Sequence, residues 1–229
     1  MGEVWLGEKM SKYLIHSCEK RYWYVENYLI PSMLKQGIEM EDILVYNDDK
    51  KQGCLTSYIK SLDILDTVVG GTWHLQDDVL ISSDFKEKTE QYDNGIVCGF
   101  CSYYSQYVPE GVQPVKDMWY SFPCIRIPNI VFRRFIKWVT SAKIQKEYQA
   151  YIKDNKYVDL LFRNHILSCY AGRTIRNLSP NIVENVDYLL GGSIINYIRD
   201  EQPSSLYFKE KNLIEELEHS IENSVYKQK

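Results

Sequence analysis

The stretch that decides the fold is residues 12–48, which read KYLIHSCEKRYWYVENYLIPSMLKQGIEMEDILVYND. Two short apolar runs within it, 12–17 and 42–47, stop at polar residues and predict buried strands. Between these runs, Pro31 interrupts a helical pattern and Gly37 ends it. The apolar residues of that pattern are Val25, Leu29, Met33 and Leu34. The segment therefore predicts a β-α-β unit with a kinked or broken crossover helix.

The segments that follow continue the alternation of helix and strand. A second helix is expected over 54–69, and a third strand over 72–76 (TWHLQ) stops at Asp77 and Asp78. Further strands are expected over 95–104 and 118–127, and helices over 131–139, 144–153 and 158–170. We predict an α/β fold with a mostly parallel sheet flanked by helices and a helical C-terminal part. A single domain is expected over 1–204, with an amphipathic helix or tail over 205–229.

The composition is that of an ordinary globular protein. The 229 residues are 45% hydrophobic and 25% charged, with 12 Gly and 7 Pro, which excludes collagen-like and disordered chains. The first residues lack a basic region followed by an apolar one, and no uncharged apolar run reaches the length of a membrane span. We therefore expect a cytoplasmic protein without a membrane span. Six cysteines spread along so long a chain favour free thiols.

Charge is distributed unevenly along the chain. Residues 126–176 contain 11 Lys/Arg and 3 Asp/Glu, a local net charge of +8. Since the whole chain has 27 Lys/Arg and 31 Asp/Glu, the remainder has 16 against 28, a net charge of −12. Two interpretations stay open for the basic part: a surface that meets an anionic partner, or helices that carry Lys and Arg for solubility alone.

Polar residues follow each of the three predicted N-terminal strands. They are His16, Ser17, Cys18 and Arg21 after the first, Asn47, Asp48 and Asp49 after the second, and Gln76, Asp77 and Asp78 after the third. Open α/β sheets bind ligands at the carboxyl ends of parallel strands. Adjacent carboxylates resist burial unless a cation or donors compensate, which favours a divalent ion held with substrate phosphates. The alternative is that Asp77 and Asp78 cap the following helix.

These pieces, taken in order, resemble the nucleotide-sugar glycosyltransferases of the GT-A fold, of the small bacterial or phage type. The resemblance covers residues 12 to about 200, and its most specific motif is the short acidic one. The pieces are 13–17, the helix 21–36, 43–48 (ILVYND), Gly53 with Ser57, and 73–79 (WHLQDDV). The resemblance implies a GT-A, Rossmann-like nucleotide-binding sheet and a single catalytic domain over 1–204.

The resemblance also implies roles for the residues of the donor site. Asp78, the last carboxylate of the motif, would hold Mn or Mg on the diphosphate of the donor, and Asp77 would face the ribose or sugar. Gln76 replaces the first acidic residue of the motif and would position the ion or donor without adding charge. The remaining donor-binding residues are Ser17 and Arg21 beside the nucleotide, Asp48 as an acceptor for the base or ribose, and Gly53 and Ser57 in the next helix.

On the acceptor side, the resemblance implies a carboxylate at the start of a late helix, and Asp159 fits that place. In an inverting enzyme it would be the general base. The alternative is that Asp159 is there because the helix dipole favours an acidic residue. Residues 180–183 resemble the Pro-x-x-Val segment that in many members leads to a metal-binding His, whose place Asn185 takes.

The expected activity is metal-dependent transfer of a sugar, of the hexosyltransferase kind, from a nucleotide-sugar to an acceptor hydroxyl. A second hypothesis keeps this chemistry and takes the acceptor to be a polyanion at residues 126–176, such as a hydroxylated base in DNA. A third hypothesis is a catalytically silent nucleotide-sugar-binding protein, since Gln76 and Asn185 both depart from the family pattern.

Overall fold

The structure of the protein is a computed structural model. It describes residues 12–65, 70–100, 111–115, 122–155, 157–169, 175–191 and 208–224. Parts of the segments predicted over 54–69, 95–104, 118–127, 158–170 and 205–229 lie outside these residues. Among the described residues, no helix is long and apolar enough to cross a membrane.

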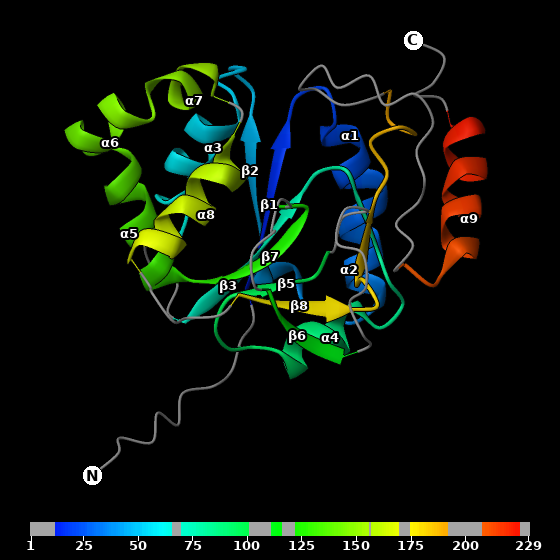
Figure 1. The fold of residues 1–229 in the computed structure, drawn as a ribbon. Helices are drawn as coiled ribbons and strands as arrows, with labels where there is room; N and C mark the ends of the chain where they lie inside the picture. The colour runs from blue at the N-terminus through cyan, green and yellow to red at the C-terminus, as the bar shows by residue number, and fades with distance from the viewer. Residues whose placement is uncertain are drawn as a thin grey trace.

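Within the described residues, a seven-stranded mixed sheet forms the centre of the fold (Figure 1). In spatial order its strands are β2 (Ile43–Asp48), β1 (Lys12–Cys18), β3 (Gly71–Gln76), β7 (Cys124–Pro128), β5 (Val97–Cys98), β8 (Ile175–Ser179) and β6 (Gly111–Val115). The pairs β1–β2, β1–β3 and β5–β8 are parallel, and β3–β7, β5–β7 and β6–β8 are antiparallel. A separate two-stranded sheet pairs β4 (Val79–Ile81) with β9 (Val183–Asn185). The predicted α/β class, with a sheet flanked by helices, is confirmed.

Helices cover both faces of the central sheet. In Figure 1, α3 (Cys54–Ser61), α5 (Asn129–Val139), α6 (Ala142–Glu147), α7 (Gln149–Asp154) and α8 (Val158–Cys169) gather on one side. The other side carries α1 (Tyr22–Tyr24), α2 (Ile30–Lys35), α4 (Phe85–Gln91) and α9 (Lys211–Glu222). A short 3-10 turn, Met40–Asp42, leads into β2. The alternation of side chains on β1 explains the two layers: Tyr13 and Ile15 belong to the core under α1 and α2, and Leu14 to the core under α3 and α5.

The crossover helix between β1 and β2 is irregular where the sequence predicts it. A π-helical turn over Val25–Leu29 joins α1 to α2, and the Ile30 amide donates to the Val25 carbonyl. Pro31 follows at once, and it has no amide hydrogen to donate. The helix is continuous, so the irregularity is a π-turn rather than a break.

Two helix predictions are wrong. The helix expected over 54–69 ends at Ser61, and residues 62–65 form turns in which amides donate to carbonyls three residues earlier. Residues 144–153 were expected to form a single helix, but the structure has α6 and α7, which meet at Tyr148. Tyr148 leaves the helical conformation at φ −107° and ψ 26°, and its ring packs 5.6 Å from that of Trp138 on α5. Packing against a neighbouring helix therefore overrides a continuous helical pattern that contains no Gly or Pro.

Candidate functional site

The candidate site lies at the carboxyl ends of β1 and β3. From β1 the chain crosses to β2 on one side, then returns to β3 on the other side of β1. Such a change of direction opens a crevice outside the strand ends, which is where open α/β sheets bind ligands. β1 ends at Ser17 and Cys18, and β3 ends at Gln76, directly before Asp77 and Asp78. The pairing of His16 with Gln76 places the two ends side by side.

A buried arginine binds both carboxylates of the acidic pair. Arg21 Nη1 donates to Asp78 Oδ2 and lies 3.4 Å from Asp77 Oδ1, and the Cys18 amide donates to Asp77 Oδ2 at 3.1 Å. Arg21 is 3% exposed, Asp77 6% and Asp78 8%. The turn after β1 therefore supplies the cation that allows the two carboxylates after β3 to be buried.

The electrostatics of this cluster follow from burial and from the two adjacent negative charges. Burial and the Asp78 charge raise the pKa of Asp77, against the Arg21 guanidinium, the Cys18 amide and the Ser17 hydroxyl, which lower it. Burial by itself would lower the pKa of Arg21. The negative charges of Asp78 and Asp77 have the larger combined effect, so the pKa of Arg21 is raised. Arg21 therefore keeps its positive charge inside the fold.

The alternative role for the acidic pair, capping of the next helix, is wrong. Asp77 and Asp78 are followed by β4, and the next helix, α4, begins only at Phe85, with Asp84 at its N-cap. The Asp78 carbonyl accepts from the Val186 amide at 2.8 Å, so the segment after β9 lies directly against the acidic pair. Asp187 in that segment is 5% exposed, and its charge also raises the pKa of Arg21.

A divalent cation fits this site in one particular way. Asp78 Oδ1 is buried and has no hydrogen-bond partner among the described residues, whereas Oδ2 is taken by Arg21. In the same part of the chain, no three His, Cys, Asp or Glu side chains gather closely enough to hold a metal ion by themselves. Mg²⁺ sites commonly use one or two carboxylates together with substrate phosphates. The residues therefore fit an ion that binds together with an anionic ligand.

The loop after β2 is closed by Asp48. Asp48 Oδ2 accepts from the Gly53 amide at 3.0 Å, and Oδ1 accepts from Gln52 Nε2 at 3.2 Å. Burial would raise the pKa of Asp48, but the donors of Gln52 and Gly53 outweigh it and lower the pKa. Ser57 Oγ donates to the Gly53 carbonyl at 2.9 Å. The structure thus shows Asp48, Gly53 and Ser57 holding one another at the start of α3.

Asn155 ties the end of α7 to the start of α3. Its Oδ1 accepts from the Thr56 amide at 2.9 Å, and its Nδ2 donates to the Gln52 carbonyl. Asn155 adopts the left-handed conformation (φ 54°), which Asn tolerates better than most residues. A Cβ on Gly53 (φ 93°) would lie 2.8 Å from Asn155 Cγ, so only glycine fits there.

Asp159 belongs to the same neighbourhood through Cys54. Burial raises the pKa of the Cys54 thiol, and the charges of Asp159, Asp77, Asp78 and Asp48 raise it further. Asp159 lies in the first turn of α8, where burial raises the pKa of its carboxyl, against the amides of Leu160 and of Asp159 itself. The charges of the predicted general base and of the predicted metal ligand therefore both act on the thiol of Cys54, the first residue of α3.

Beneath the strand ends lies a buried aromatic stack. His16 Nε2 and His74 Nδ1 are 3.0 Å apart, and the Tyr58 ring stacks on His16 with 3.7 Å between ring centroids. Burial lowers the pKa of both histidines, and that of His74 falls to about 3. Both imidazoles are therefore neutral near pH 7. They support the floor of the site without adding charge.

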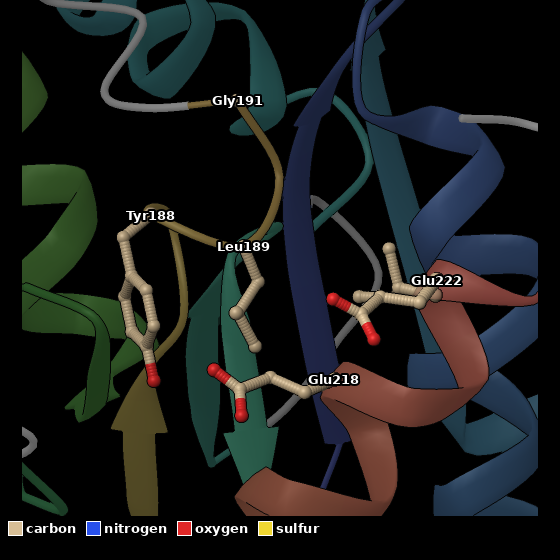
Figure 2. Close-up of a pocket in the computed structure, with 6 residues that line it drawn as sticks. Tyr188, Leu189, Gly191, Glu218 and Glu222 are labelled. Carbon is tan, nitrogen blue, oxygen red and sulfur yellow. The ribbon is translucent and has the colours of Figure 1, made fainter. Parts of the chain in front are cut away.

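A separate hollow of about 220 Å³ lies between the turn after β9 and α9 (Figure 2). Its lining residues are Tyr188, Leu189, Gly191, Glu218, Ile221 and Glu222. Figure 2 shows the Glu218 carboxylate and the Tyr188 hydroxyl pointing toward one another. These six described lining residues include two carboxylates and no cation, so they repel a phosphate ligand. The strand ends are therefore the better candidate for an anionic ligand.

Several residues around the acidic pair and the start of α3 are not among those predicted from the sequence. Tyr24 donates to the Val79 carbonyl at 2.9 Å beside the acidic pair, and Asn155, Cys54 and Asp187 complete the surroundings. The one available signal was the position of Asp187, two residues beyond Asn185, which the resemblance singled out. No local pattern marks the others, because their contacts join elements far apart in the chain.

The comparisons with known proteins add nothing to this geometry. No protein-family model matches the sequence, and no curated protein matches it. The function is therefore inferred from the site itself.

Proposed function

We propose that the protein transfers a sugar from a nucleotide-sugar donor to an acceptor hydroxyl at the carboxyl ends of β1 and β3. The observation that carries the proposal is the buried acidic pair at these strand ends, with Asp78 Oδ1 unpartnered among the described residues. A buried carboxylate oxygen without a donor is costly unless a ligand satisfies it. A divalent ion bound with a diphosphate would do so.

The residues of the site suit the charge changes of this reaction. The bond between the anomeric carbon and the diphosphate oxygen breaks, and its electron pair leaves on the diphosphate. Mn or Mg, when bound at Asp78, would supply positive charge to this leaving group. Arg21 adds a second, permanent positive charge beside the same carboxylates. Asp77 holds that guanidinium in place together with Asp78.

Asp159 is the residue suited to the acceptor side. The acceptor oxygen forms the new bond to the anomeric carbon while its proton passes to the Asp159 carboxylate. Burial raises the pKa of this carboxyl, which makes it a better proton acceptor than an exposed aspartate. The bonds of Asn155 tie the residue after α7, four positions before Asp159, to Gln52 and to Thr56 in the first turn of α3.

The test is a panel of nucleotide-sugars with Mn present, measured by thermal shift and by nucleotide release. A donor that binds the folded state raises Tm by mass action. We expect one class of donor to raise Tm and to be slowly hydrolysed. Asp159→Asn should keep the Tm shift and lower nucleotide release about 100-fold or more. Asp154→Asn, exposed on α7, is the matched control.

Two results would contradict parts of the proposal. A panel in which no donor shifts Tm would remove the nucleotide-sugar site. A donor that shifts Tm without any nucleotide release from the unaltered protein would leave a nucleotide-sugar-binding protein without transferase activity.

A further inference from the structure

The described part of the basic segment includes cations that serve the fold and cations that are exposed. Arg126 is 5% exposed and bonds Asp93 at 2.9 Å, and Arg176 bonds Asn94 Oδ1 at 2.8 Å, so both serve the fold. Five cations are exposed on the outer helices: Arg134 and Lys137 on α5, Lys143 and Lys146 on α6, and Lys153 on α7. We call these five residues the basic surface. In Figure 1, α5, α6 and α7 form the outer edge of one helical layer.

None of these five cations is in a salt bridge with a described residue. The acidic residues of α5, α6 and α7 are Glu147 and Asp154 alone, against six Lys/Arg when half-buried Arg133 is included, a net charge of +4. A chain of net charge −4 therefore presents a local positive field on this layer.

An exposed tyrosine shares α7 with Lys153. Tyr151 on α7 is 44% exposed, and its ring lies 5.4 Å from that of Tyr157, edge to face, and 6.4 Å from that of Tyr148. Cations that contact phosphates, together with exposed aromatic rings on which bases stack, are the means by which proteins hold single-stranded nucleic acid.

The end of α7, where Tyr151 lies, is bonded to the start of α3 beside the candidate site. Asn155 directly follows α7 and bonds the Thr56 amide and the Gln52 carbonyl at the start of α3. Tyr157 lies two residues further on and Asp159 four. A nucleic acid strand bound along α6 and α7 would therefore run toward Asp159, the residue expected on the acceptor side.

We propose that the basic surface, with Tyr151, binds a nucleic acid strand whose bases are accessible. This inference concerns binding only and rests on the exposed cations and on Tyr151, not on the proposed transferase activity. If the proposed transferase activity also holds, nucleic acid becomes the class of acceptor. A lipid surface suits the layer less well, because Ile130 and Tyr151 are the two exposed large hydrophobic residues among the described residues of α5, α6 and α7, and helices that lie on membranes carry a continuous apolar face.

The test is fluorescence anisotropy of a labelled 20-nucleotide oligothymidylate with the full chain, over 50 to 200 mM NaCl. Affinity should fall as salt rises, since each phosphate contact to a single strand contributes about 0.7 to the logarithmic salt slope. Lys143→Glu with Lys146→Glu should weaken binding at 50 mM about tenfold or more and flatten the slope by about 1.4. Lys35→Glu with Lys88→Glu, on α2 and α4, carries the same charge change and should leave binding within about twofold.

Two substitutions of Tyr151 measure how much base stacking adds to binding beyond the charge of the lysines. Tyr151→Ala should weaken binding about 5- to 100-fold, and Tyr151→Phe should restore it, because stacking needs the ring and not the hydroxyl. Four results would each overturn the proposal: no binding by the unaltered protein, equal loss in both lysine pairs, no effect of Tyr151→Ala, or equally tight binding of poly-glutamate or of phosphatidylserine vesicles. Donor-induced thermal shifts are measured separately, so failure here leaves the proposed transferase activity standing.

Discussion

The acidic pair and the basic surface are both charged regions of the described structure, and they differ in burial and in pairing. Asp77 and Asp78 are at most 8% exposed and share Arg21, which is 3% exposed. The five cations of the basic surface are exposed and have no salt-bridge partner among the described residues. The total charge of −4 conceals both regions.

The difference shows which observations point to a ligand in each region. Burial of charge costs several kcal/mol unless the charge is paired, so the ion pairs of Arg21 are a requirement of the fold. The unpartnered oxygen Asp78 Oδ1 is what indicates a ligand. Exposed lysines are solvated by water, so their lack of partners has little cost. At the basic surface, the observations that indicate a ligand are the exposed ring of Tyr151 and the nearby candidate site.

The largest expected effect is on the buried pair. Arg21→Ala leaves two buried carboxylates without a cation and should lower the free energy of unfolding by about 3 to 5 kcal/mol. Adding Asp78→Asn to this variant should recover part of the loss, because one uncompensated charge is gone. Urea denaturation at pH 7 measures both. Glu19→Gln removes the exposed pair with Lys51 (3.6 Å) and should change stability by about 1 kcal/mol or less.

The buried histidines should make the free energy of unfolding fall as the pH falls. Unfolded imidazoles titrate near pH 6.5, whereas burial lowers the pKa of His16, and that of His74 to about 3. Between these values the unfolded chain binds protons that the folded chain does not, so stability falls as pH falls. His74→Leu should flatten this dependence by about 1.4 kcal/mol per pH unit between pH 5.5 and 4. An unchanged slope, or equal flattening by His219→Gln on exposed α9, would show that His74 is not the titrating group.

Arg21 and a divalent ion should compete for the same carboxylates. Arg21→Gln releases Asp78 Oδ2 and removes a nearby positive charge, so Mn²⁺ binding without donor should tighten about tenfold, or about 1.4 kcal/mol. Electron paramagnetic resonance of free Mn²⁺ measures the affinity, with Arg134→Gln on the exposed basic surface as the control. Weaker Mn²⁺ binding in Arg21→Gln would mean that Arg21 shapes the ion site rather than competing with the ion.

The smallest effect is expected on the basic surface. Lys143→Gln with Lys146→Gln should change the free energy of unfolding by about 0.5 kcal/mol or less, since exposed positions without partners contribute little. The same variant should weaken oligothymidylate binding. A large loss of stability would show that these lysines support the fold and would weaken the contrast with Arg21.

The first three strands and their polar ends could be predicted from the sequence, because apolar runs that stop at polar residues are local signals. β1, β2 and β3 lie within a residue or two of the predicted spans. The ion pairs of Arg21 could not be predicted, since they join residues 56 and 57 positions apart. The hydrogen bonds that Asp48 accepts from Gln52 and Gly53 could not be predicted either, since this loop closure depends on the conformation of Gly53.

The most direct test of the central claim is calorimetric titration of the best donor with and without Mn²⁺, in the unaltered protein and in Asp78→Asn. The site at β1 and β3 predicts that Mn²⁺ tightens donor binding in the unaltered protein and that Asp78→Asn abolishes this gain, while Asp154→Asn retains it. Donor binding that gains equally from Mn²⁺ in Asp78→Asn would contradict the assignment of Asp78 and, with it, the site proposed here.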